Sequence, residues 1–128
     1  MSDGGGGKTM GEFLKRLNAG LNPICSTFTQ VPFQTPYPYI TLEAEQILQG
    51  LPWGPCMVIL TVKIWSRYTG TQEILRLAKN VEAFLQTYGG PAFEVSLKIL
   101  ESTLVLLADG QTRLHCFRLK ARLSGAHP

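Results

Sequence analysis

Apolar and polar positions alternate most clearly in the middle of the chain, between Met57 and Arg67. One set of alternate positions is apolar from Val58 to Ile64, whereas the other set is polar or aromatic from Thr61 onward. The apolar set is Val58, Leu60, Val62 and Ile64, and the opposite set is Thr61, Lys63, Trp65 and Arg67. Because successive side chains of a strand point to opposite faces, this alternation predicts a strand with one buried face.

The period changes to helical spacing directly after this strand. Thr69 followed by Gln72 resembles a capping box, and Glu73 would place a negative charge in the first turn. The apolar stripe that follows is Ile74, Leu77, Ala78, Val81, Phe84, Leu85 and Tyr88. We therefore predict an amphipathic helix that ends at the Gly89–Pro91 segment.

A second helical stripe lies near the N-terminus and consists of Met10, Phe13, Leu14, Leu17 and Leu21. It predicts a helix from about Lys8 to Ala19, with Gly20 and Pro23 as stop signals. The glycine run that precedes it offers little side-chain surface to pack. We therefore expect residues 1–7 to form a flexible arm.

The remaining strands are shorter or less regular. Asp109 and Gly110 favour a hairpin turn because both tolerate positive φ. The prolines between Val31 and Tyr39 exclude a helix or a central strand there, and Gln49–Pro55 has the composition of a loop. The expected strands are Cys25–Val31, Tyr39–Leu42, Phe93–Leu100, Thr103–Ala108 and Thr112–Leu123.

These elements predict an α+β fold: a mostly antiparallel sheet with two helices packed on one face. The length of 128 residues suits a single domain. We expect that domain to span residues 8–123, between the arm at 1–7 and a C-terminal tail at 124–128.

Composition limits the class of protein without defining a function. The chain has 16% charged residues and a net charge of +3, which does not by itself imply nucleic-acid binding. Three scattered cysteines suit a reducing compartment rather than disulfides. With no signal peptide or membrane-spanning run, we expect a soluble protein inside a cell.

The residues that could carry catalysis or bind a cofactor are poorly arranged for either. Gly4–Thr9 resembles a phosphate-binding loop but lacks the first glycine and the preceding strand. His115 and Cys116 should face opposite sides of a strand, and His127 lies in the tail. No CxxC or HxxxH pairing accompanies Cys25, Cys56 or Cys116. We therefore expect no catalytic residue, no metal and no cofactor.

Two features remain as candidates for function. The first is a basic strand face, which is a candidate electrostatic surface formed by Lys63, Arg118, Lys120 and Arg122. It could be a solvated face, or it could meet an acidic partner or DNA. The second is the proline-rich segment with Phe33, Tyr37 and Tyr39, which could cover the core of its own domain or contact a neighbouring subunit.

Three segments also resemble a family of small proteins from long-tailed bacteriophages, prophages and gene transfer agents. These segments are Val31–Ile40, Ile64–Glu73 and Asp109–Leu119, and they occur in the family's order and at about its spacing. The family is of the tail-completion or tail-terminator type. The resemblance spans roughly Asn18 to Leu123; Gln34–Thr35 and the glycine-rich arm depart from the family pattern.

The resemblance implies a non-enzymatic, tail-terminator-like protein that forms a hexameric ring of copies of itself. Such a ring sits on the head-proximal end of the tail tube, stops its polymerisation and joins the head–tail connector or stopper protein. DNA could pass through the lumen without specific binding. The subunit and partner contacts that we select are Pro36, Tyr37, Pro38, Tyr39, Trp65, Arg67 and Tyr68. Trp65 could instead belong to the core under the first helix.

The resemblance places the protein in the virion, at the head–tail joint, after assembly in the host cytoplasm. Two alternatives stay open. The chain could be another neck or tail-tube protein of the particle, or it could be a small basic nucleic-acid-binding module.

Overall fold

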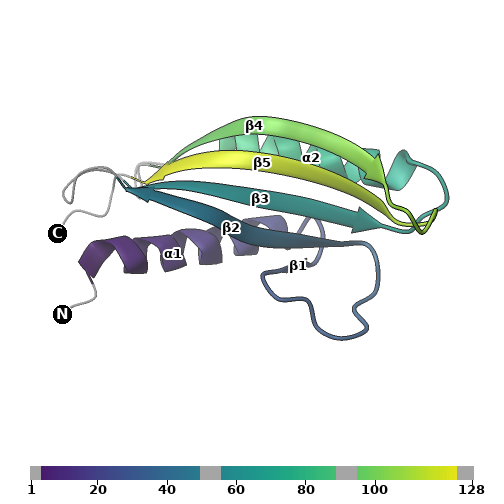
Figure 1. Ribbon diagram of the computed structural model, residues 1–128, viewed down its shortest axis with the longest axis horizontal. Helices are drawn as coiled ribbons and strands as arrows, with labels where there is room; N and C mark the ends of the chain where they lie inside the picture. The colour runs from purple at the N-terminus through teal and green to yellow at the C-terminus, as the bar shows by residue number, and fades with distance from the viewer. Residues whose placement is uncertain (1–3, 50–55, 89–94, 124–128) are drawn as a thin grey trace.

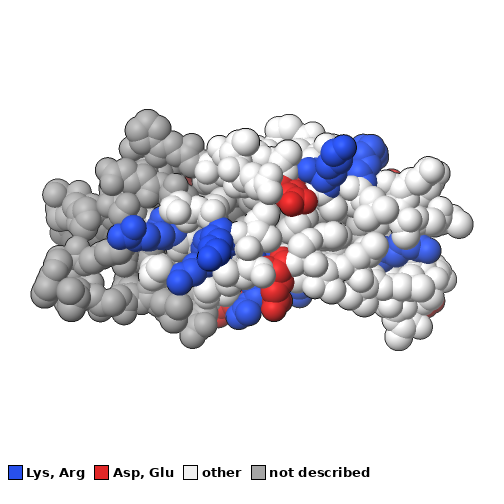
Figure 2. Space-filling view, turned by 90° about the horizontal axis from the view of Figure 1, so that it is seen from above, with Lys and Arg blue, Asp and Glu red and all other residues white. Residues whose placement is uncertain are grey.

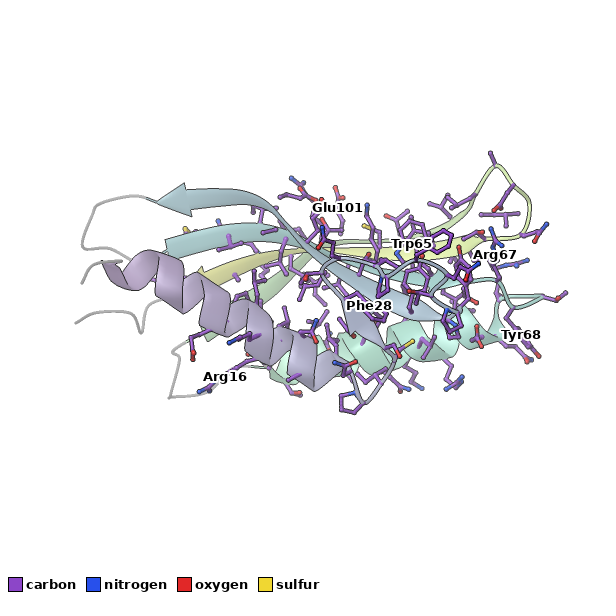
Figure 3. The ribbon with its side chains drawn as sticks, turned by 90° about the horizontal axis from the view of Figure 1, so that it is seen from below. Arg16, Phe28, Trp65, Arg67, Tyr68 and Glu101 are labelled. Carbon is purple, nitrogen blue, oxygen red and sulfur yellow. The ribbon has the colours of Figure 1, made fainter. Side chains whose placement is uncertain are left out.

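The computed structural model describes residues 4–49, 56–88 and 95–123. Within these ranges, two helices and five strands form two layers, with the sheet on one side and both helices on the other (Figures 1 and 3). In chain order they are α1 (Gly4–Leu21), β1 (Thr27–Phe28), β2 (Tyr39–Gln49), β3 (Cys56–Ser66), α2 (Gln72–Thr87), β4 (Val95–Leu106) and β5 (Arg113–Leu123). The predicted α+β class is confirmed.

The strands lie in the order β1-β2-β3-β5-β4. All pairs are antiparallel except β1–β2, where two residues of β1 run parallel to the start of β2. β3 and β5 are therefore central strands, and β4 forms one edge of the sheet. Central position explains why the alternating patterns of β3 and β5 are the clearest in the sequence, since one face of each is fully covered.

The core lies between the helices and one face of the sheet. The alternation in β3 is reproduced, because Val58, Leu60, Val62 and Ile64 are all fully buried. Burial of one such side chain stabilises the fold by about 1.5–3 kcal/mol. The other fully buried large side chains are Phe13, Leu17, Leu21, Ile40, Leu42, Ile74, Leu85, Phe117, Leu119 and Leu123.

Helix α1 is longer than expected at both ends. It begins at Gly4, within the predicted arm, and it continues through Gly20 to Leu21. Gly20 is therefore an interior residue of the helix and not its stop signal. A Cβ atom at Gly20 would lie 2.3 Å from Cζ of Phe84, so glycine lets α1 approach α2 closely.

Strand β1 is shorter than the predicted Cys25–Val31 strand. Two asparagine side chains, Asn18 in α1 and Asn22 just after it, bond the backbone of Thr27. Asn22 Oδ1 accepts from the Thr27 amide at 3.1 Å, and Asn18 Nδ2 donates to its carbonyl at 3.3 Å. Pairing with β2 covers only Thr27 and Phe28, opposite Ile40 and Thr41.

Strands β2 and β4 are longer than expected. β2 runs on from Leu42 to Gln49, with a register shift between Ala44 and Gln46. The two strands predicted between Phe93 and Ala108 are a single strand, β4, with a register shift between Ile99 and Glu101. A bulge adds one unpaired residue without ending the pairing, which is why the alternation is broken while the strand continues.

The two turn signals have different outcomes. Gly110 has φ 73°, and Leu107 N donates to Thr112 O at 2.8 Å, so the hairpin predicted at Asp109–Gly110 is confirmed. The capping box predicted at Thr69 is wrong, because α2 has Thr71 as its N-cap and this residue makes no side-chain cap hydrogen bond.

Ser66 takes over the role of fixing the start of α2. Its Oγ donates to Glu73 Oε1 at 2.7 Å and accepts from Tyr68 N at 3.2 Å.

Some expectations lie outside the described residues: residues 1–3 of the arm, 50–55 of the predicted loop, the stop signal at Gly89–Pro91, Phe93, and the tail at 124–128.

Candidate interaction surface

Aromatic side chains gather on the sheet face that the helices leave uncovered. Trp65 stacks on Tyr39 across the β2–β3 pair, with ring centroids 6.3 Å apart and an interplanar angle of 25°. Trp65 Nε1 donates to Thr41 Oγ1 at 2.9 Å. The structure therefore places Trp65 opposite the core and not under α1, while its neighbour Ile64 is the residue buried beneath the helices.

The loop that leads into β2 adds a second layer to this cluster. The rings of Tyr37 and Tyr39 lie 5.1 Å apart, and the guanidinium of Arg67 lies 4.8 Å from the Tyr37 ring centroid. Phe28 of β1 meets Tyr39 edge-on at 6.3 Å. Burial, and then the neighbouring Tyr37, raise the pKa of Tyr39.

Arg67 ties this cluster to the β4–β5 turn. Its Nε donates to Thr112 Oγ1 at 2.9 Å, and its Nη2 lies 3.5 Å from Asp109 Oδ2. Asp109 also accepts from Thr112 Oγ1 and from the amides of Gln111 and Thr112. These hydrogen bonds, those of Thr112 first, lower the pKa of Asp109 to about 2.

The other predicted contact residues lie around this cluster. Pro36 is exposed and Pro38 is half-buried in the loop before β2. Tyr68 lies apart from the stacked rings (Figure 3), and it lines an open hollow of about 440 Å³ with Gln72, Glu73 and Arg76. The structure thus brings Tyr37, Tyr39, Trp65 and Arg67 together, whereas Tyr68 lies beside the first turn of α2.

The predicted basic face shares the uncovered face of the sheet but is partly neutralised. Arg118 Nε donates to Glu45 Oε1 at 3.2 Å, and Glu45 also accepts from the Thr61 hydroxyl. The hydrogen bond from Thr61 is the largest cause that lowers the pKa of Glu45, and Lys63 contributes to the same shift. Glu101 on β4 lies opposite Arg118 in the register.

A second group on the same face, away from the aromatic cluster, consists of basic residues only. Lys98 of β4 and Lys120 of β5 are directly opposite each other, and Arg122 follows two residues later. Like charges placed opposite each other destabilise a strand pair. Sequence patterns did not identify Lys98, because its position depends on the β4–β5 register.

The histidine and cysteine of β5 cannot act as a pair. His115 faces the helices, where its ring lies 4.6 Å from Phe117 and its Nε2 lies 2.9 Å from Ser102 Oγ. Cys116 pairs with Lys63 and Thr103 on the other face. Burial raises the pKa of Cys116 and lowers that of His115, so each group is held in its uncharged form.

The described residues form neither a metal site nor a membrane-spanning helix. Within residues 4–49, 56–88 and 95–123, no three His, Cys, Asp or Glu side chains gather in a way that could hold a metal ion. Neither described helix is long and apolar enough to cross a membrane.

Two exposed apolar features lie outside the set of contact residues selected from the sequence. Phe33, at the tip of the loop before β2, is 92% exposed. The outer edge of β4 exposes Leu100, Leu104, Val105 and Leu106. The unbroken apolar run from Leu104 to Leu107 was the available signal for this edge, since a strand covered on one face alternates and this run does not.

Comparison with known proteins supports the fold. No model of a protein family matches the chain, and no curated protein matches it. Among solved structures, the chain is similar to a chain described as part of the "Virion of native gene transfer agent (GTA) particle". The TM-score is 0.62 at 16% sequence identity, and the match covers 84% of this chain and 83% of the other. At this identity, the likeness shows a shared fold.

Proposed function

We propose that the chain is a structural protein of a phage-like or gene-transfer-agent virion, and within it a tail terminator. The likeness of nearly the whole fold to a chain of a gene transfer agent virion carries this proposal. The three segments that resemble the tail-terminator family support it independently, because two of them supply the aromatic cluster of Tyr37, Tyr39, Trp65 and Arg67.

In this role, copies of the chain close into a ring, which we take to be a hexamer. A ring closes when each subunit offers two different complementary patches and the rotation returns to its start. One face of the ring binds the end of the tail tube, and the other binds the head–tail connector or stopper protein. The second face does not reproduce the tube contact, so no further tube subunit adds. The role is structural and requires no catalysis or cofactor.

We propose that the subunit and partner contacts of the ring are made by the aromatic cluster and the residues next to it. Aromatic and proline residues lose little conformational entropy on docking, and Arg67 already has its guanidinium positioned by Asp109 and Thr112. The full set of proposed contact residues is Pro36, Tyr37, Pro38, Tyr39, Trp65, Arg67 and Tyr68. The protein would act in the virion at the head–tail joint, after assembly in the host cytoplasm.

Particles made without this chain test the proposal. A terminator is expected to leave tails of uncontrolled length that lack heads, and negative-stain images would show both defects. Normal tails joined to heads would contradict the proposed role. Supplying the unsubstituted chain in trans should restore both tail length and joining.

Substitutions separate contact from folding. Tyr37→Ser removes an exposed part of the cluster and should reduce joined particles while the thermal unfolding midpoint changes little. Leu75→Ser is a matched control, because Leu75 is 49% exposed but lies on α2, away from the cluster. Equal assembly by the two variants would exclude Tyr37 from the contact.

A nucleic-acid-binding module is a second candidate, favoured by the Lys98–Lys120 pair and Arg122. Salt-sensitive DNA binding lost on combined Arg118→Ala, Lys120→Ala and Arg122→Ala substitution would support it. We expect only weak binding, because Glu45 and Glu101 flank Arg118.

Another neck or tube protein is distinguished by its assembly: a tube protein polymerises into long fibres alone, whereas a terminator stops at rings.

A further inference from the structure

Phe33 is held away from the body of the molecule as an apolar knob. It is 92% exposed, although it belongs to a loop with an ordered turn in which Thr35 Oγ1 donates to Pro32 O at 2.6 Å. Gln34, the next residue, has φ 60°, a conformation that non-glycine residues rarely adopt. A fixed turn that presents a phenyl ring to water is typical of a contact residue, because the ring loses little freedom on docking.

The outer edge of β4 carries exposed apolar side chains on both of its faces. Leu104 and Leu106 pair with His115 and Arg113 on the helix side, and Val105 pairs with Leu114 on the uncovered side. Leu104, Val105 and Leu106 are 39%, 41% and 55% exposed. Among the strands of the described residues, β4 pairs only with β5. Figure 2, seen from the β4 side, shows uncharged surface between separate basic and acidic side chains on the half of the molecule that carries the β4–β5 turn. An edge of this kind invites contact with another chain.

The strand register places the knob and this edge at the same end of the sheet. One row of paired residues runs from Tyr39 through Trp65 and Leu114 to Val105. The loop with Phe33 leads directly into Tyr39, at the opposite edge from Val105. Figure 1 shows this loop and the β4–β5 turn at the same end of the molecule.

This placement suits a second copy of the chain in the same orientation. The knob of one copy then meets the β4 edge of the next copy at the same height. The strand directions are compatible, because β2 is antiparallel to β3, β3 to β5 and β5 to β4, so β2 and β4 run in opposite directions. Two different patches on opposite edges make a heterologous contact, which can repeat around a closed ring.

We propose that Phe33 of one copy docks on the β4 edge of the next copy, against Leu104, Val105 and Leu106. This contact deepens the proposed function and rests on it, since it assumes a ring of identical subunits. The head connector and the tail tube are the competing occupants of the same apolar edge.

Mixing two defective variants tests the contact. Phe33→Asp lacks the knob but retains the β4 edge, whereas Leu106→Asp retains the knob but lacks the edge. Each variant alone should remain monomeric where the unsubstituted chain forms rings. An equimolar mixture should give heterodimers and nothing larger, because one knob and one edge remain intact. Native mass spectrometry measures these species, and Leu75→Asp is the control that should still form rings.

Cysteine cross-linking gives a second readout that tolerates weak association. In a variant with Cys25, Cys56 and Cys116 replaced by Ser, Phe33→Cys with Leu106→Cys should oxidise to a ladder of covalent oligomers. The control pair, Phe33→Cys with Leu75→Cys, should not. Circular dichroism confirms that every variant is folded.

The outcomes separate this contact from the proposed function. Rings formed by Phe33→Asp, or rings that give no Phe33–Leu106 cross-link, overturn the contact and leave the ring standing. Loss of binding to the tube or to the connector, with ring formation intact, assigns the patch to that partner and overturns the contact between copies. Failure of the unsubstituted chain to form rings, alone or with tail tube added as a template, overturns both.

Discussion

Gly20 of α1 lies directly against the ring of Phe84 on α2. A Cβ atom added at Gly20 would lie 2.3 Å from Phe84 Cζ and 2.7 Å from Cε1, which are distances that real Cβ atoms do not tolerate. The ring of Phe84 also meets Tyr88 at 5.4 Å between centroids. The two helices therefore approach each other on the sheet because one of them has no side chain at this position.

We expect Gly20→Ala to destabilise the protein by about 1 kcal/mol. Overpacking costs about 1–3 kcal/mol, and the better helix propensity of alanine offsets roughly 0.5–1 kcal/mol of it. Gly11→Ala is the matched control, because nothing lies within 4 Å of a Cβ at that helical position and the variant should be more stable. Urea unfolding measures both changes. Phe84→Leu combined with Gly20→Ala should recover stability, and failure of this rescue would contradict the steric explanation.

A second prediction concerns the start of α2. Ser66 is fully buried, and its hydroxyl bonds both Glu73 and the amide of Tyr68. Ser66→Ala should cost about 1–3 kcal/mol, because it leaves buried polar groups without a partner. Thr71→Ala should change stability by less than about 0.5 kcal/mol, since the N-cap side chain makes no cap hydrogen bond. Thermal unfolding measures the loss of stability in both variants. Equal losses in Ser66→Ala and Thr71→Ala would show that the Thr71 side chain also stabilises the start of α2.

Strand alternation, helical stripes and the contact of Gly20 differ in how far they can be predicted from sequence. Alternation predicted the buried face of β3, and it does the same in β5, where Phe117, Leu119, Ala121 and Leu123 alternate with basic residues. A central strand covered on one side imposes a period of two. The helical stripe of α2 was equally clear. The role of Gly20 could not be predicted, because a glycine near a helix end is also a normal stop signal, and only the position of Phe84 distinguishes the two.

The interaction surface could be predicted only in part, because alternation assigns a side chain to a face of the sheet but does not identify its neighbours there. Alternation placed Lys63 and Trp65 on the face opposite Ile64, and the structure agrees. The stacking of Trp65 on Tyr39 depends on the β2–β3 register, which no local pattern specifies. The exposure of Phe33 depends on how its loop leaves the sheet, and a phenylalanine in a sequence is more often buried.

Asp109 predicts a loss of stability in acid. Its pKa of about 2 in the folded protein is below the ordinary value of 3.8, so the folded state favours the carboxylate. This stabilisation is fully present above pH 4 and is lost as pH falls from about 4 to about 2. Asp109→Asn should remove the pH dependence in this window, because the asparagine side chain that replaces the carboxylate accepting from Thr112 does not titrate. Urea unfolding at a series of pH values measures it, with Glu12→Gln, an exposed carboxylate of α1, as control.

His115 predicts a second, separate pH dependence with the same sign. Burial lowers its pKa below 6.5, and its Nδ1 is buried with no hydrogen-bond partner among the described residues. The unfolded chain therefore binds a proton more readily, so stability falls as pH drops through about 6.5 toward the lower folded-state pKa. His115→Gln should flatten the free energy of unfolding over this range, whereas substitution of the other histidine, His127→Gln, should leave the slope intact. An unchanged slope in His115→Gln would show that another group titrates.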